Sequence, residues 1–299
     1  MKTPVLLLLF NRPDETKQLI ECLEKIKPSR IFIVADGHRP LIIGEKEKCN
    51  EVKDIVSNLN WTCEVNTNFR STNLGCRESV SQGIDWFFDH VEEGIILEDD
   101  CIPHESFFNY CTELLEKYRF DNEVMHIGGN NFQFGKARGD SDYYFSIYNH
   151  VWGWATWRRA WSHYNDIFEL DKIEDELRKF IGHRATFKYF EEVFSKVAAK
   201  QIDTWDFIWT YSCWKAHGLS IIPNKNLVTN IGFGHQATHT RNVSSVQSKI
   251  PALNIGSPLK HPKQKKINRK ADKYTFYTIL RALTIKDRIN MFKRKLLFK

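Results

Sequence analysis

The sequence has no apolar run long enough to cross a lipid bilayer. The longest one near its start, Val5–Phe10, is far below the roughly 20 residues that a spanning helix needs. It also lacks the basic start and the small-residue cleavage site of a signal peptide. There is no C-x-x-C pair, and the seven cysteines are odd in number and scattered. We therefore expect a cytoplasmic protein with reduced thiols.

A uniform positive charge is absent as well. The net charge is +6, but residues 260–299 carry fourteen Lys and Arg against two Asp, which makes +12 and leaves −6 on the first 259 residues. Nucleic-acid binding requires an electropositive face on the folded body. The composition therefore excludes nucleic acid as the expected partner.

The sequence contains enough apolar residues for a large core. Strand and helix patterns alternate along its first half. The chain has 299 residues, of which 42% are hydrophobic and 13% aromatic. This alternation predicts an α/β fold with a doubly wound, mostly parallel sheet. The expected strands are Pro4–Phe10, Arg30–Gly37, Thr62–Thr67 and Gly94–Leu97, with helices at 13–26, Glu45–Leu59 and Cys76–His90 between them.

The pattern changes after residue 100. We expect a domain over 1–242 with halves 1–128 and 129–242, a linker at 243–270 that is rich in Pro, Lys and polar residues, and a basic helical tail at 271–299. Further elements are expected at Glu105–Tyr118, Val124–Gly128, Asp171–Lys200, Asp203–His217, Leu219–Ile222 and Leu227–Thr229.

Three acids follow the fourth predicted strand: Glu98, Asp99 and Asp100. Ligands of open α/β sheets bind at the carboxyl ends of the strands. Three carboxylates there repel one another unless a cation or hydrogen-bond donors offset them, and hard divalent cations favour oxygen ligands. The alternative is an acidic first turn of a helix, which the helix dipole would favour.

Together with other motifs, this triplet resembles the GT-A glycosyltransferases. The likeness is greatest to the N-acetylglucosaminyltransferase I group (family 13) and looser to family 2. The motifs, in order, are Asn11-Arg12, Asp36, Glu98-Asp99-Asp100 followed by Pro103 and Phe107-Phe108, Gly153-Trp154, Trp205-Asp206 and Phe233-Gly234. The resemblance implies a GT-A fold with a Rossmann-like donor half, and an enzyme that transfers a hexosyl or N-acetylhexosaminyl group from a nucleotide sugar to a glycan hydroxyl.

The resemblance also implies roles for the donor-half residues. Arg12 and Asp36 would lie against the nucleoside of a UDP-linked donor. Arg77 falls where the family has a donor-contacting residue, although this chain has Cys76-Arg77 where a His is expected. Glu98 and Asp99 would face the sugar and the ribose.

In this resemblance Asp100 would bind Mn²⁺ or Mg²⁺ bridging the two phosphates of the donor. Such an ion uses few protein carboxylates, with substrate oxygens and water completing its shell. It would offset the charge that grows on the departing nucleoside diphosphate.

Asp206 is the candidate catalytic base, since an inverting transfer needs a carboxylate to take the proton of the acceptor hydroxyl. Asp203 is the alternative, and it suits helix capping better. Gly153 and Trp154 are expected to form a wall of the donor pocket, because glycine permits close approach of the backbone. His235 and His239 lie in a loop with two glycines that could close over the donor.

Basic and apolar residues alternate along the tail, which is typical of an interfacial helix attracted to anionic lipid. The alternative is a helix packed on the body with a solvated basic face. The first interpretation predicts peripheral association with the cytoplasmic face of the membrane. It suits a lipid-linked or surface-polysaccharide acceptor.

Two rival functions are a sugar-nucleotide pyrophosphorylase and a non-catalytic glycan-binding protein at the membrane surface. A pyrophosphorylase should carry a glycine-rich phosphate loop after its first strand, but residues 11–15 contain no glycine. A scaffold would not need both Asp100 and Asp206. A retaining mechanism on the same fold remains a third alternative.

Overall fold

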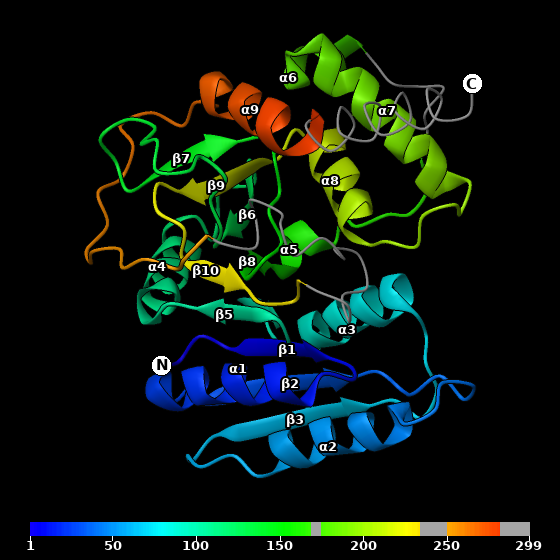
Figure 1. Cartoon of the computed structure of the whole chain (residues 1–299). Coiled ribbons are helices and arrows are strands. Elements are labelled where there is room, and N and C mark those ends of the chain that lie inside the picture. Colours follow the sequence, from blue (N-terminus) through cyan, green and yellow to red (C-terminus); the bar gives the residue numbers. More distant parts are fainter. Residues whose placement is uncertain (169–174, 234–249, 282–299) are drawn as a thin grey trace, which may run out of the picture.

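The fold is described from a computed structural model, which covers residues 1–168, 175–233 and 250–281 (Figure 1). A single eight-stranded sheet runs through the molecule in the order β3-β2-β1-β4-β8-β6-β9-β7, and a two-stranded sheet pairs β10 with β5. The predicted α/β fold class with a doubly wound, Rossmann-like half is confirmed.

The first four strands are parallel to one another. The three at the centre are buried on both faces, which is why they are continuous apolar runs. The strands are β1 (Val5–Leu9), β2 (Arg30–Ala35), β3 (Glu64–Phe69) and β4 (Glu93–Glu98), and they are connected by helices α1 (Pro13–Ile26), α2 (Glu45–Ser57) and α3 (Cys76–His90).

The second half of the sheet is mixed. Strand β8 is antiparallel to both β4 and β6, β6 is parallel to β9, and β7 is antiparallel to β9. Its strands are β6 (Val124–Gly128), β7 (Tyr143–Ser146), β8 (Trp154–Trp157) and β9 (Leu219–Pro223), while the small sheet holds β5 (Cys101–Pro103) and β10 (Val228–Asn230).

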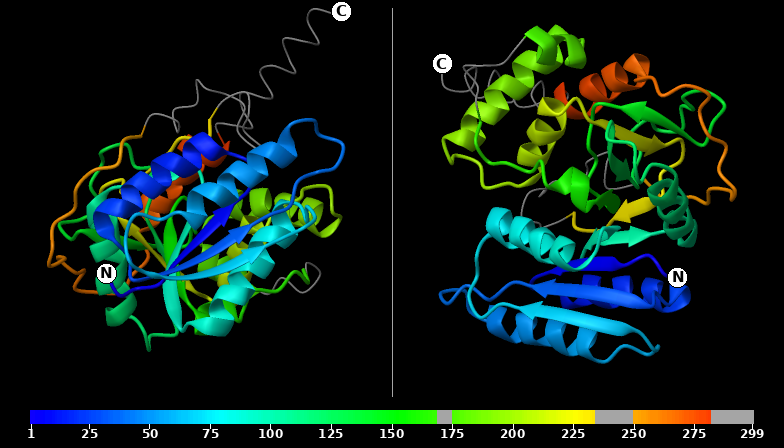
Figure 2. Two further views of the ribbon diagram at one scale, coloured as in Figure 1. Left: turned by 90° about the horizontal axis from the view of Figure 1, so that it is seen from below. Right: turned by 180° about the vertical axis from the view of Figure 1, so that it is seen from behind.

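Helices cover both faces of the sheet (Figure 2). Helix α1 packs on α2 and α4, while α3 packs on β1 and α5. Helices α6, α7 and α8 form a separate layer over the second half (Figure 1). The remaining helices are α4 (Glu105–Lys117), α5 (Arg158–Trp161), α6 (Asp175–Ile181), α7 (Arg184–Ala198), α8 (Asp206–Lys215) and α9 (Arg269–Thr275), which continues into a π-helical turn at Phe276–Leu280.

Two predicted helices differ from the structure. The helix expected at Asp171–Lys200 is two helices, α6 and α7, because Gly182 has a φ of +65° and His183 then caps α7 through its ring nitrogen and the Thr186 N–H. The helix expected from Asp203 begins at Asp206. Residues 169–174 lie outside the described part.

The expected linker is packed against the body over residues 250–268. Ile255 and Leu259 are buried in the main core. Their backbone N–H groups donate to Ser106 Oγ (3.0 Å) and to Glu113 Oε1 (3.0 Å) on α4.

The first part of the expected tail is also packed on the body. Phe276 and Ile279 are buried, and the Asp272 carboxylate accepts a hydrogen bond of 2.6 Å from Ser146 Oγ on β7. Over 271–281 the chain therefore follows the packed-helix alternative, while 282–299 lies outside the described residues. No helix in the described part of the chain combines the length and hydrophobicity that a bilayer crossing requires.

Candidate active site

The candidate site lies at the carboxyl edge of the first half of the sheet. Strands β1 and β4 are parallel neighbours, with Leu8 opposite Glu98. Because both strands end at this edge, the Asn11-Arg12 turn after β1 lies beside the acidic triplet after β4. The sheet register thus brings Arg12, which the resemblance places against the nucleoside, beside Glu98, Asp99 and Asp100.

Arg12 bridges two of the three acids. Its Nη1 atom lies 2.9 Å from Asp99 Oδ1 and 2.8 Å from Asp100 Oδ2. All three side chains are at most 15% exposed. Burial lowers the pKa of the Arg12 guanidinium, but the two carboxylates raise it more, so Arg12 stays charged.

The acids outnumber this cation. Burial is the main reason that the pKa of Glu98 is raised well above its ordinary value, and repulsion by Asp100, Asp99 and Asp206 adds to it. Burial likewise raises the pKa of Asp99, against the lowering effect of Arg12. The cluster therefore has a carboxylate excess that a bound cation would relieve.

Asp100 is also held by the end of β10 and by the residues that follow it. Its Oδ1 accepts a hydrogen bond from Asn230 Nδ2 (3.1 Å), and its carbonyl oxygen accepts one from the Ile231 N–H (2.8 Å). A Cβ atom on Gly232 would lie 2.0 Å from Asp100 Oδ2. Asn230 and Gly232 are not among the predicted site residues, because the sequence does not reveal the pairing of β10 with β5 or the closeness of residue 232 to Asp100.

Asp206 is the first residue of α8, where the helix dipole favours a carboxylate. Its Oδ1 accepts hydrogen bonds from its neighbours, the Phe207 N–H (2.9 Å) and the Thr204 hydroxyl. The charge of Asp206 contributes to the raised pKa of Glu98. It also helps to raise the pKa of the Cys76 thiol to about 12, where burial is the largest cause and Glu98 the second. Asp206 therefore lies close enough to Glu98 and Cys76 to act on both electrostatically.

Asp203 also lies near Cys76, but its side chain is more exposed than that of Asp206. Its Oδ2 is 3.2 Å from the place where a Cβ on Gly75 would be, and its charge acts on Cys76. Asp203 is exposed, whereas Asp206 is half-buried.

Asp36 is only 4% exposed and joins two loops. Its carboxylate accepts hydrogen bonds from the N–H groups of Gly37 (2.9 Å) and Leu74 (3.2 Å) and from Asn73 Nδ2 (2.9 Å). Burial raises its pKa, and the two backbone N–H groups lower it. The loop after β2 is thereby tied to the loop before α3, while the expected contact with a nucleobase stays a prediction.

Arg77 is engaged elsewhere, since it forms an ion pair with Asp166 beyond α5. Trp154 is fully buried and stacks on Trp205 with ring centroids 5.6 Å apart. Its ring therefore supports the site from the core instead of lining it. Gly153 is required for packing, because it has a φ of +63° and its Cβ would lie 2.8 Å from Val228 Cγ2.

His235 and His239 lie outside the described residues, so nothing is added to their predicted roles. Among the described residues no group of three or more His, Cys, Asp or Glu side chains is arranged to hold a metal ion alone. The oxygen donors and the carboxylate excess fit a hard cation that gains further ligands from a diphosphate. Such a cation would have to share the carboxylates with Arg12 or displace it.

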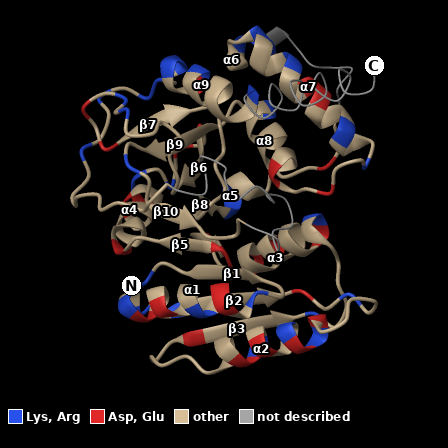
Figure 3. Ribbon diagram, in the orientation of Figure 1, with Lys and Arg blue, Asp and Glu red and all other residues tan. Residues whose placement is uncertain are grey.

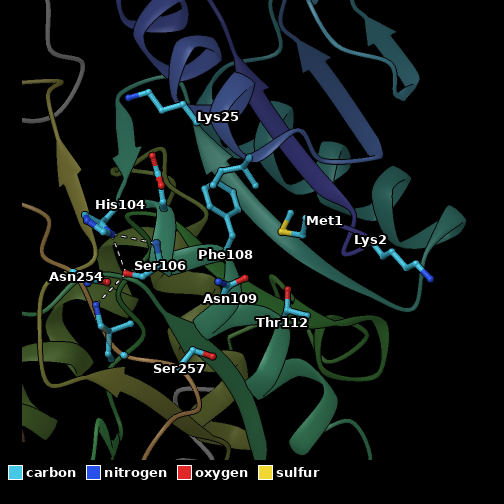
Figure 4. A pocket seen from close by; sticks show the side chains of 14 residues that line it. Met1, Lys2, Lys25, His104, Ser106, Phe108, Asn109, Thr112, Asn254 and Ser257 are labelled. Carbon is cyan, nitrogen blue, oxygen red and sulfur yellow. Dashed lines mark hydrogen bonds between the residues drawn. The ribbon is translucent and has the colours of Figure 1, made fainter.

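A cavity of about 820 Å³ opens at the opposite, amino edge of the sheet, between the end of α1 and the start of α4 (Figure 4). His104, Ser106, Asn109, Thr112 and Asn254 are among its lining residues. None of the predicted site residues lines it. Its polar groups are therefore separate from the acidic cluster.

No protein-family model matches the chain, and no curated protein matches it. Solved structures that are similar to part of the chain include three enzymes. The galactosyltransferase LgtC, solved with donor and acceptor sugar analogues, is 11% identical; the match covers 71% of this chain and 70% of that chain with a TM-score of 0.35. An apo UDP-glucose pyrophosphorylase is 8% identical, with 77% of this chain and 93% of that chain covered and a TM-score of 0.38. The mannosyltransferase PcManGT from Pyrobaculum calidifontis, solved with GDP-Man and Mn²⁺, is 13% identical, with 52% of this chain and 45% of that chain covered and a TM-score of 0.32. The match spans less than half of PcManGT. These distant likenesses carry no functional assignment.

Proposed function

We propose that this protein is a metal-dependent glycosyltransferase of the GT-A type. It would move a sugar from a nucleoside-diphosphate donor, most simply a UDP-sugar, to a hydroxyl of a glycan acceptor with inversion. The observation that carries the proposal is the cluster of Arg12, Glu98, Asp99 and Asp100 at the carboxyl edge, with Asp206 within electrostatic range of Glu98. The order of motifs along the chain, which resembles family 13, supports it.

In this proposal Asp100 would hold a Mn²⁺ or Mg²⁺ ion together with the donor diphosphate. When bound, the metal supplies charge compensation for the leaving nucleoside diphosphate. Arg12 adds a second positive charge at the same place, where it can turn from the carboxylates to a phosphate oxygen. A planar guanidinium suits both partners, because it binds carboxylate and phosphate with the same hydrogen-bonding geometry.

Asp206 acts as the general base. It is half-buried at the start of α8 and lies within electrostatic range of Glu98. Its carboxylate would take the proton of the acceptor hydroxyl while that oxygen attacks the anomeric carbon. The aromatic layer behind it, in which Trp205 stacks on Trp154, fixes the start of the helix.

Nucleotide-sugar binding is the direct test. Thermal unfolding would be followed with UDP- and GDP-sugars, with and without Mn²⁺, because a ligand that binds the native state raises the melting temperature. We expect a Mn²⁺-dependent rise with one nucleotide class and none for Asp100→Asn. Full donor turnover in EDTA would overturn the metal requirement, and pyrophosphate-dependent release of a nucleoside triphosphate would favour the pyrophosphorylase.

We also propose that the basic segment beyond Arg281 attaches the protein to an anionic membrane surface, on the cytoplasmic side, near a lipid-linked acceptor. Its support is the basic composition of residues 282–299, which carry six Lys and Arg against one Asp. A chain ending at Arg281 keeps the packed α9 and the basic residues of 260–281, so it should lose only the part of the attraction that residues 282–299 supply. Equal, salt-sensitive vesicle binding by the short and full chains would contradict it.

A further inference from the structure

The loop between β2 and α2 carries the two most exposed large aliphatic side chains among the described residues. Leu41 is 93% exposed and Ile43 102%, and Ile42 between them is 48% exposed. The loop projects beyond the carboxyl ends of the strands in both views of Figure 2. Soluble proteins expose single apolar residues often, but contiguous ones mark a contact site.

This tip is held in place by its base. The Arg39 N–H donates to Glu45 Oε2 (2.7 Å), and Asn11 Nδ2 donates to Glu45 Oε1 (2.8 Å). The Arg39 guanidinium also pairs with Glu45, which is buried at the start of α2. The apolar residues are therefore presented on a fixed turn.

More apolar surface adjoins the base of the loop. Phe69 at the end of β3 is 37% exposed and Leu74 is 38% exposed. They belong to the segment that Asp36 ties to the loop after β2. Lys53 Nζ lies 5.7 Å from the Phe69 ring, so a cation accompanies this apolar surface.

We infer that Leu41, Ile42 and Ile43, which we call the apolar tip, insert into the interface of a lipid bilayer at the carboxyl edge of the sheet. A stable protein interface takes roughly 20–30 residues a side, far more than this tip supplies. A protein can bind a bilayer by inserting only a small apolar surface at the depth of the headgroups. Adjacent cations strengthen this binding through their attraction to anionic lipid. Helix α2 carries both signs of charge (Figure 3), so the apolar side chains supply the main attraction.

The consequence for the acceptor rests on the proposed function, whereas membrane binding by the tip does not. The tip and the candidate site share one edge of the sheet. An enzyme docked through this edge would meet a lipid-linked acceptor at the membrane surface.

The test is co-sedimentation of the full chain with vesicles of phosphatidylcholine, with and without phosphatidylglycerol, at low salt and at about 0.5 M NaCl. High salt screens the attraction of the basic tail but leaves apolar insertion in place. We expect Leu41→Ser/Ile43→Ser to lower the partition at high salt by at least about tenfold. Phe120→Ser is the matched control, because Phe120 is 90% exposed and follows α4 at the opposite edge.

Equal partition of the double variant and the unmodified protein would overturn the inference. So would a dimer in analytical ultracentrifugation that the double variant loses, because the tip would then be a protein contact. Ile43→Glu serves if the double variant fails to fold. Donor hydrolysis without lipid is measured on the same samples, so that a failure of the proposed function is seen separately from a failure of membrane binding.

Discussion

Arg12 and Asp100 form an ion pair across the ends of neighbouring strands, with Arg12 Nη1 lying 2.8 Å from Asp100 Oδ2. The same nitrogen lies 2.9 Å from Asp99. A single guanidinium therefore occupies the position between two carboxylates that a divalent cation would also favour. The charge balance of the candidate site depends on this residue.

Replacing Arg12 with Gln should destabilise the fold, since it leaves two mostly buried carboxylates without their cation. Removing one partner of a buried pair costs about 3–5 kcal/mol. Arg119→Gln is the matched control, because Arg119 pairs with Glu93 at the surface and such pairs contribute about 0–1 kcal/mol. Urea unfolding measures both, and Mn²⁺ should restore part of the lost stability of Arg12→Gln only.

A methyl group at position 232 should disturb the site without unfolding the protein. The Cβ of Gly232→Ala would lie 2.0 Å from Asp100 Oδ2 and would push the carboxylate aside. A displacement of this size at a reacting centre can cost about 10²-fold in turnover. Gly256→Ala, where no atom lies within 4 Å of the added Cβ, should turn over like the unmodified protein. Similar rates for both variants would show that Asp100 has no part in the reaction.

The two candidate bases can be separated by amide substitutions. Asp206→Asn should keep the affinity for the donor and lose about 10²–10⁴-fold in transfer, the usual contribution of a positioned base. Asp203→Asn should lose much less, because Asp203 is exposed and precedes α8. The reverse ranking would make Asp203 the base, and no effect from either would favour a retaining route.

Asp272 should make stability depend on pH. Burial raises its pKa from 3.8 to about 7, although Ser146 and the Ile147 N–H lower it. Between these two values the folded protein keeps a proton that the unfolded chain has released, so this contribution to stability declines as pH rises to 7. Asp272→Asn should therefore lose less stability than the unmodified protein between pH 5 and about 8. Chemical unfolding at both pH values tests this, with the exposed Asp14→Asn as control, and equal slopes would contradict it.

The first half of the fold could be predicted from the sequence because its strands are central and parallel. Such strands are apolar on both faces, and the glycines and acids that follow them mark where they end. Helix α3 and strand β6 have the predicted bounds, Cys76–His90 and Val124–Gly128. Strands β7 and β8 were missed, because their runs of four residues, Tyr143–Ser146 and Trp154–Trp157, have an aromatic composition that a loop wall or a core helix could share.

In the site, sheet geometry explains which residues gather at the carboxyl edge, but it does not determine how their side chains pair. Arg12 lies beside the acidic triplet because β1 and β4 are parallel neighbours that end at the same edge. Its bond to Asp100 depends on side-chain reach, and Asn230 arrives through the antiparallel pairing of β10 with β5. The burial of Trp154 depends on which face of β8 meets the core, and so short a strand does not reveal it.

The packed segment 250–281 has a consequence for the order in which the molecule is completed during synthesis. The buried Gln133 amide finds Ala271 O and Thr275 Oγ1 as partners, and the Asp142 N–H donates to Lys260 O. All of these partners are translated more than a hundred residues after the groups that need them. A nascent chain on the ribosome can close its parallel half early, but the second half has unsatisfied buried groups until α9 has emerged.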